Sequence, residues 1–347
     1  MMKNNEMNFD QFLNICGGLK QILTEQNVDF ENVKIQAEYH NPYFTKLEVN
    51  RMIDLIVKNY LDQDKLKIWI SNYQIRNIRS SKKLGIIAAG NIPLVSFHDV
   101  LCCLCFGCEI YIKMSTKDSI LSKYIYEQIN ILSGSEHPKI SFVERLNDVD
   151  ALIATGGSLA TNHFRTYLEK FPCIIRSHRN SIAVLSGKES VEDLVKLGLD
   201  IYSYFGLGCR NVGHLYLPFD YPIENLINIL DTHYRYVKEN TKYRNNYDYQ
   251  FALLCLNNKH FLQGESLLWV EDKSLNPPIA TINFSYYSNL DMLDSNINSD
   301  LNKIQCVASN SLLTSVATIK LGHCHDPELM EYQDGIDTLL FLNNIQE

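Results

Sequence analysis

The chain has 347 residues and a formal net charge of -8, with 46% hydrophobic and 21% charged residues. This is an ordinary globular composition, which argues against collagen, coiled coil and extensive disorder. The pI of 5.7 argues against nucleic acid as a partner, because phosphate binding requires a basic face. At roughly 150 residues per domain, the length predicts about two domains.

The N-terminal residues MMKNNEMNFDQF are polar and acidic, unlike the basic start and apolar run of a signal peptide. No run of about 18 apolar residues occurs, so we expect no membrane span and a cytoplasmic location. Ten cysteines in such a chain predict free thiols instead of a disulfide framework. The cluster at 102–108 lies on one apolar stretch without a second ligand pair, so we predict packing cysteines and no metal site.

The hydrophobic pattern predicts a helical start followed by strands that alternate with helices. Residues 8–75 repeat apolar side chains at helical spacing. Beyond residue 83, short apolar strands alternate with helices of about a dozen residues, which is typical of a parallel, doubly wound sheet. The predicted strands are 83–90, 110–113, 140–143, 151–154, 173–175 and 182–185, and the predicted helices are 95–106, 118–131 and 158–170.

A second α/β pattern begins after Ser186-Gly187, which predicts a domain boundary near residue 186. The aromatic and polar segment 240–250 is predicted to be a loop, and the apolar segment 335–342 a final strand. The remaining predicted elements are helices at 191–204, 222–238 and 288–303 and strands at 214–217, 279–284 and 315–320.

The strongest local signal is the turn Phe205–Asn211, with the sequence FGLGCRN. A cysteine nucleophile must be reachable, and backbone N–H groups or nearby cations must favour its thiolate. Cys209 is flanked by glycines, which allow close approach of a substrate carbonyl, and by Arg210. A buried cysteine beside a structural turn is an equally weighted alternative.

Ligands in parallel sheets bind at the carboxyl ends of the strands. Asn91 follows one such strand and could donate to an oxyanion, or it is a turn asparagine. Lys113 ends the next strand and could reach a ribose or phosphate, or it is a solvated lysine. The segment Thr155–Ser158 precedes a helix whose N-terminus could hold phosphate, or it is a tight turn.

Histidines offer candidate proton donors, although most histidines in proteins are structural or exposed. The four candidates are His98, His163, His178 and His214. The pair His323 and His325 lacks a distant second pair of ligands, so it predicts no metal site either.

Taken in order, these motifs resemble those of the aldehyde dehydrogenase superfamily. The segments GNIPLVSFHDVL, DALIATGG, RNSIAVLSG and SYFGLGCRNV resemble the LuxC-type acyl-CoA reductases more closely. The resemblance runs from about residue 80 to the terminal YQDGIDTLLFL. It implies an aldehyde dehydrogenase-like α/β fold with a Rossmann-like cofactor-binding domain and N-terminal helices at 1–186. It also implies an α/β catalytic domain at 187–325 and, at 326–347, a C-terminal strand element that forms a homodimer or higher oligomer.

The resemblance also implies a mechanism in which Cys209 attacks a fatty acyl thioester of coenzyme A or of a carrier protein. The enzyme-bound thioester then takes a hydride from a nicotinamide cofactor and leaves as an aldehyde. Asn91 and the Cys209 backbone N–H would stabilise the oxyanion. The residues that would contact the cofactor are Lys113 and Ser115 at the adenosine ribose and Thr155, Gly156 and Ser158 near the pyrophosphate.

Three departures from the superfamily pattern refine this expectation. Hydrolytic relatives carry a glutamate base in a Glu-Leu-Gly-Gly stretch, where this chain has Arg176–Arg179. Without that carboxylate, water is poorly activated, which favours reduction or acyl transfer. Lys273–Pro278 replaces the Glu-x-Phe-Gly-Pro segment. Met114, Ser115 and Thr116 follow Lys113 where NAD-preferring relatives have an acid, so no carboxylate repels a 2′-phosphate and NADPH is favoured.

Two other readings remain open at this level. The chain could use Cys209 for acyl transfer or thioester hydrolysis without reduction. It could also be a non-catalytic binding subunit that kept the fold, although the intact Cys209 and Asn91 count against this.

Overall fold

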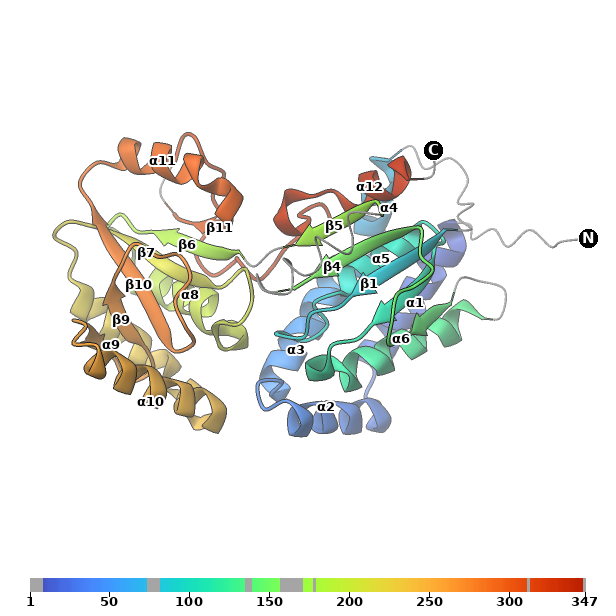
Figure 1. The fold of residues 1–347 in the computed structure, drawn as a ribbon, viewed down its shortest axis with the longest axis horizontal. Coiled ribbons are helices and arrows are strands. Elements are labelled where there is room, and N and C mark those ends of the chain that lie inside the picture. Colours follow the sequence, from blue (N-terminus) through green and yellow to red (C-terminus); the bar gives the residue numbers. More distant parts are fainter. Residues whose placement is uncertain are drawn as a thin grey trace, which may run out of the picture. The chain divides into compact units, whose positions relative to one another are not determined.

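The computed structural model describes residues 9–73, 82–134, 139–156, 171–176, 179–310 and 313–345. The chain forms two compact units, the first built from 1–178 together with 327–347 and the second from 179–326 (Figure 1). The sequence predicts a boundary near residue 186, but the units divide between residues 178 and 179. The reason is that the strand Asn180–Val184 pairs within the sheet of the second unit. The predicted helix 158–170 lies outside the described residues.

The first unit contains a five-stranded parallel sheet in the order β3-β2-β1-β4-β5. Its strands are β1 Lys83–Ile87, β2 Glu109–Lys113, β3 Ile140–Phe142, β4 Ala151–Thr155 and β5 Cys173–Arg176. The chain moves outward in one direction from β1 to β3 and then returns to add β4 on the other side of β1. The point between β1 and β4 is therefore a topological switch point, where doubly wound sheets bind ligands.

Helices surround this sheet, and the predicted helical character of residues 8–75 is confirmed in its described part. In the helix α1, for example, the apolar residues Phe12, Ile15 and Leu19 recur at helical spacing and form one buried face. The helices of this unit are α1 Phe9–Thr24, α2 Val28–His40, α3 Lys46–Leu55, the π-helical turn Ile56–Tyr60, α4 Gln63–Ser71, α5 Phe97–Cys105, the 3₁₀ turn Thr116–Asp118, α6 Ile120–Ser133, the 3₁₀ turn Gln333–Gly335 and α12 Thr338–Asn344.

The predicted C-terminal strand at 335–342 is wrong, because most of this segment belongs to the helix α12. The Asp337 side chain caps the helix by accepting the Leu340 N–H at 2.9 Å. Leu339 and Leu342 are fully buried and lie three residues apart, which is helical and not strand spacing. The helix packs against α5 of the same unit.

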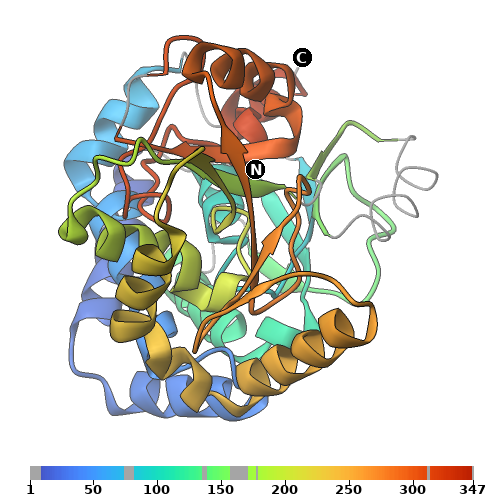
Figure 2. The same cartoon turned by 90° about the vertical axis from the view of Figure 1, so that its left-hand side faces the viewer.

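The second unit contains a six-stranded sheet in the order β11-β6-β7-β10-β9-β8, parallel except for the β8–β9 pair. Its strands are β6 Asn180–Val184, β7 Val212–Pro218, β8 Leu262–Gln263, β9 Leu268–Glu271, β10 Thr281–Tyr287 and β11 Ile304–Ala308. Its helices are α8 Val191–Tyr202, α9 Ile223–Tyr234, α10 Thr241–Leu256 and α11 Leu290–Ser299, with 3₁₀ turns at Ser203–Gly206, Arg235–Glu239 and Leu301–Lys303. Within this unit, α11 lies on one side of the sheet and α9 and α10 on the other (Figures 1 and 2).

Two predictions for the second unit are wrong. The predicted loop 240–250 is the first part of α10, capped by Asn240, whose side chain accepts the N–H groups of Lys242 and Tyr243 at 3.1 Å. Tyr243 and Tyr247 supply the buried face of this helix at a spacing of four residues. The predicted strand 315–320 is instead a single bridge between Ala308 and Ile319.

Candidate active site

Cys209 occupies a central position in the four-residue turn Gly208–Asn211. The Asn211 N–H donates to the Gly208 carbonyl at 3.1 Å, and the Gly208 N–H donates to the Asn211 Oδ1 atom at 2.8 Å. The hydroxyl of Ser181 on β6 donates to the Cys209 carbonyl at 3.1 Å. Cys209 itself is partly exposed, so a residue with some solvent access, on a backbone held by hydrogen bonds, stands where the sequence predicted a nucleophile.

The segment that leads into this turn is strained. Tyr204, Phe205 and Gly206 adopt positive φ angles of 52°, 57° and 75° in succession. The left-handed conformation costs about 1–2 kcal/mol for each residue that carries a Cβ atom, and such strain tends to accumulate at functional sites. Tyr204 and Phe205 are buried, and the Phe205 ring lies 5.8 Å from that of Tyr243. Their packing holds the strained backbone in place.

Arg210, the cation that the sequence places beside Cys209, binds a second segment of the same unit. Its Nη1 atom donates to the Cys324 carbonyl at 3.2 Å and contacts the Cys306 Sγ atom at 3.4 Å. Asp200 on α8 holds that segment too, by accepting the N–H groups of Gly322 at 2.6 Å and Cys324 at 2.9 Å. Burial raises the pKa of Asp200 to about 6 against these hydrogen bonds.

In the first unit, several predicted cofactor residues gather at the carboxyl edge of the sheet. Ile87 of β1 pairs with Lys113 on one side and with Ala154 on the other. The next residues, Thr155 and Gly156, are partly exposed at the switch point, and Lys113 is exposed. The Gly156 N–H donates to the Arg176 carbonyl at 3.4 Å. Ser158, the remaining predicted pyrophosphate contact, lies outside the described residues.

The loop that carries Asn91 is packed tightly against the end of β2. A Cβ atom at Gly90 would lie 2.5 Å from the Ser115 Oγ atom, so only glycine allows this approach. Leu94 has a φ of 52°, and its N–H donates to Asp118 at 2.8 Å. Burial raises the pKa of Asp118 to about 7. Asn91, partly exposed, therefore sits in a loop with little freedom.

The residues at this edge fit a dinucleotide phosphate. Lys113 and Lys117 make no ion pair with any carboxylate of the described residues. Asp118, the acid next to Lys117, is turned into the core toward Leu94 and Ser122. Glu109, the nearest acid to Lys113 in the sequence, accepts the Tyr111 hydroxyl at 3.2 Å. An exposed pair of cations beside a sheet edge, without a facing carboxylate, favours an anionic ligand.

Arg176, at the position where the sequence suggested a missing glutamate base, forms a buried ion pair. Its Nη1 atom donates to Asp99 of α5 and to the Gln333 Oε1 atom at 3.2 Å, and its Nη2 atom donates to the Thr338 Oγ1 atom at 2.9 Å. The two charged side chains are 3% and 2% exposed. Sequence reasoning missed Asp99, because its partner is 77 residues away.

The two described candidate histidines have structural roles. The His98 Nε2 atom lies 3.0 Å from the Leu329 carbonyl oxygen, and the ring is buried. His214 lies 3.1 Å from the Ser274 carbonyl oxygen and 2.8 Å from the Ser285 hydroxyl. Burial lowers the pKa of His214 to about 4, so it stays neutral in neutral solution. The two other candidates lie outside the described residues: His163 and His178.

All ten cysteines are free thiols. Cys102 and Cys103 of the 102–108 cluster are fully buried, and burial raises the pKa of each thiol well above its usual value, as expected of packing residues. Across the described ranges, no group of three His, Cys, Asp or Glu side chains could hold a metal ion. Among the same residues, no helix is long and apolar enough to cross a membrane.

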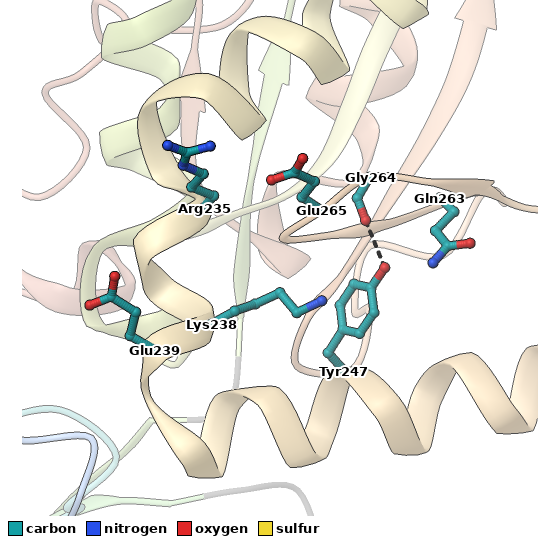
Figure 3. Close-up of a pocket in the computed structure, with 7 residues that line it drawn as sticks. All are labelled: Arg235, Lys238, Glu239, Tyr247, Gln263, Gly264 and Glu265. Carbon is teal, nitrogen blue, oxygen red and sulfur yellow. Dashed lines mark hydrogen bonds between the residues drawn. The ribbon is translucent and has the colours of Figure 1, made fainter.

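The second unit also carries a surface cleft of about 560 Å³ (Figure 3). It is lined by Arg235, Lys238, Glu239, Tyr247, Gln263, Gly264 and Glu265. The Lys238 Nζ atom lies 3.8 Å from the centre of the Tyr247 ring, and the Tyr247 hydroxyl donates to the Gly264 carbonyl at 2.6 Å. No lining side chain is a thiol or a serine hydroxyl.

Comparison with known proteins shows which solved structures have a similar fold. No protein-family model matches the chain, and no curated protein matches it in sequence. Aldehyde dehydrogenase 21 from Physcomitrella patens, solved with succinate, superimposes with a TM-score of 0.67 at 12% identity, covering 98% of this chain and 84% of that one. Aldehyde dehydrogenase C from Pseudomonas syringae, with NAD⁺ and octanal, gives 0.65 at 10% identity, over 90% and 73% of the two chains.

A third structure is the NADP-dependent glyceraldehyde-3-phosphate dehydrogenase of Bacillus halodurans, solved with NADP. It gives a TM-score of 0.60 at 12% identity and covers 88% of this chain and 74% of that one. The fold of this protein is therefore aldehyde dehydrogenase-like, with α/β content and parallel sheets. The predicted fold class is confirmed.

Proposed function

We propose that this protein reduces a fatty acyl thioester, of coenzyme A or of a carrier protein, to the aldehyde with NADPH. The observation that carries the proposal is the Cys209 turn, a partly exposed thiol in a turn that two bulky left-handed residues precede. Solved structures of the same fold include complexes with NAD⁺, NADP and an aldehyde.

In the proposed reaction, the Cys209 thiolate attacks the thioester carbonyl, and the oxyanion collapses to expel the thiolate of the acyl donor. One thioester replaces another, so this step is close to energetic balance. Asn91 is the proposed side-chain donor to the oxyanion, together with the Cys209 N–H. A bound nicotinamide cofactor would supply the hydride that converts the Cys209 thioester to aldehyde and frees the Cys209 thiolate, and the one proton of the overall reaction is taken up by the thiolate expelled from the acyl donor.

Reduction is favoured over hydrolysis because no carboxylate stands in the stretch that carries the glutamate base of hydrolytic relatives. Arg176 stands where hydrolytic relatives have the Glu-Leu-Gly-Gly stretch, and its guanidinium is committed to Asp99. The His98 ring contacts the Leu329 carbonyl and the His214 ring contacts the Ser274 carbonyl, so each ring has a structural partner within its own unit. A thioester at Cys209 would therefore survive long enough to be reduced.

For the cofactor, we propose that Lys113 and Ser115 bind the adenosine ribose of NADPH, with Thr155, Gly156 and Ser158 near the pyrophosphate. The exposed ammonium groups of Lys113 and Lys117 support a 2′-phosphate, because no carboxylate of the described chain pairs with them. We also propose a homodimer or higher homo-oligomer, which analytical ultracentrifugation would test: a monomer at micromolar concentration refutes it.

The decisive experiment mixes purified protein, NADPH and acyl-CoA thioesters of increasing chain length and follows the absorbance of the reduced nicotinamide. We expect NADPH oxidation with aldehyde as product. Cys209→Ala should abolish it and retain cofactor binding, whereas the matched control Cys255→Ala, at an exposed cysteine, should keep full activity. A silent trace at every chain length, with an acyl group trapped on Cys209, would instead establish acyl transfer.

A further inference from the structure

One amide side chain closes the Cys209 turn. The Asn211 Oδ1 atom accepts the Gly208 N–H at 2.8 Å. Its Nδ2 atom lies within hydrogen-bond distance of three carbonyl oxygens at the end of α8 and just beyond it. These are the carbonyls of Asp200 at 3.1 Å, Ile201 at 3.1 Å and Ser203 at 2.8 Å.

The backbone of Asn211 anchors the same turn from its other end. Its N–H donates to the Gly208 carbonyl, and its carbonyl accepts the Ser181 N–H of β6, both at 3.1 Å. Asn211 is 4% exposed, so water does not compete for these bonds. The helix end, the turn and the central sheet are therefore joined through this single residue.

We infer that Asn211 is a positioning residue that holds Cys209 in the conformation in which its thiol meets the acyl carbonyl. It acts through Gly208 and the α8 carbonyls and not by contact with substrate. The inference rests on the proposal that Cys209 is the nucleophile. The reason is chemical: a carboxamide accepts the Gly208 N–H with one atom and donates to the carbonyls with another, whereas an ionised aspartate loses the donor and alanine loses both.

The strained segment explains why such a clamp is needed. Tyr204 and Phe205 would relax toward right-handed φ angles if the turn that follows them were released. Because these residues lead directly into the turn, relaxation would shift the Cys209 backbone. Displacements of about 1 Å in a reacting group can cost about 100-fold in rate.

The test separates orientation from access to the thiol. Acylation of Cys209 by an acyl-CoA, without NADPH, is followed by mass spectrometry of the intact protein and of the Cys209 peptide. In parallel, alkylation by iodoacetamide, a small reagent that needs no orientation, is measured at Cys209 with Cys255 as the internal reference. For Asn211→Ala we expect acylation to fall about 10- to 100-fold and alkylation at Cys209 to change less than about 3-fold.

Asn283→Ala is the matched control. Asn283 is a buried asparagine of the same unit, and its Nδ2 atom donates to the Ser274 carbonyl at 2.8 Å. This variant should lose stability without slowing acylation of Cys209. If Asn283→Ala slows acylation as much as Asn211→Ala, or if alkylation falls together with acylation, Asn211 is merely structural and the inference is wrong.

A second variant covers the case in which Asn211→Ala does not fold. Asn211→Asp keeps the acceptor for the Gly208 N–H and loses the donor to the carbonyls, so we expect its acylation rate to fall below that of the wild type. Acylation at the wild-type rate in either variant overturns the inference and leaves the proposed function intact. If no acyl-CoA acylates the wild-type thiol, the proposed function fails, and the inference fails with it.

Discussion

The buried ion pair between Asp99 and Arg176 gives a sharp stability prediction. Asp99→Ala leaves a guanidinium in a site where the two side chains are 3% and 2% exposed. Removing one partner of a buried pair typically costs about 3–5 kcal/mol, because the other charge stays desolvated. Neither Gln333 nor Thr338 can replace the lost carboxylate, since both are neutral. We therefore expect the free energy of unfolding of the first unit to fall by about 3–5 kcal/mol.

The chain provides its own reporter for this measurement. It has two tryptophans, Trp69 in the first unit and Trp269 in the second. In a Trp269→Phe background, Trp69 fluorescence during urea unfolding follows the first unit alone. This matters because a chain with two units does not guarantee a single two-state transition.

Two further variants decide the interpretation. Glu127→Ala removes an exposed pair with Lys123 on α6, with side chains 59% and 49% exposed, and should change stability by less than about 0.5 kcal/mol. The double replacement Asp99→Leu with Arg176→Met should recover most of the loss, since no charge then stays buried. If Asp99→Ala costs no more than Glu127→Ala, the pair is not desolvated as described and the reasoning is refuted.

Three other predictions concern the edge of the first sheet. The pKa of Asp118 is raised from 3.8 to about 7 in the folded protein, so the folded state binds more protons than the unfolded state between these pH values. As pH rises from 4 to 7, the free energy of unfolding of the wild type should therefore fall by up to about 4 kcal/mol relative to that of Asp118→Asn. A difference in urea midpoints that does not change with pH would contradict this. Gly90→Ala should weaken NADPH binding and destabilise the first unit by about 1–3 kcal/mol, because the new methyl group meets the Ser115 Oγ atom. A second substitution, Ser115→Gly, should restore the melting temperature of the Gly90→Ala protein. Lys113→Ala should reduce affinity for 2′,5′-ADP about 10-fold and for 5′-ADP less, by calorimetry; equal losses would argue against a 2′-phosphate contact.

The sequence predicts the first sheet well, because each of its strands is an apolar run bounded by turn residues. It misleads where aromatic or apolar residues pack at helical spacing in a short segment. In α10 the buried face consists of tyrosines, so the polar and aromatic pattern predicts a loop, although Asn240 supplies a helix cap that is visible in the sequence. In α12 the cap at Asp337 and the spacing of Leu339 and Leu342 carried the same signal.

The candidate site, too, is only partly predictable from the sequence. Cys209 and the strand ends are visible in the sequence because glycines and apolar strands flank them. Asn211 was visible only as part of the motif, since its partners are carbonyls at the end of α8. The pairing of Asp99 with Arg176 depends on a contact across 77 residues, which no local pattern encodes. The candidate reactive residue can therefore be predicted from the local sequence, whereas the side chains that hold it in position depend on tertiary contacts.

Strain supports one of the two interpretations of Cys209, which are a buried packing residue beside a turn and a nucleophile. The packing cysteines Cys102 and Cys103 lie in an unstrained helix, whereas two left-handed residues precede Cys209 at a combined cost of about 2–4 kcal/mol. The Asn211 hydrogen bonds, at about 1 kcal/mol each, can offset that cost. They do not themselves require the left-handed conformation of the preceding residues. A turn whose only task was to connect α8 to β7 could use a relaxed backbone at lower cost. Conformational strain that the surrounding contacts hold in place beside a partly exposed cysteine therefore favours the nucleophile.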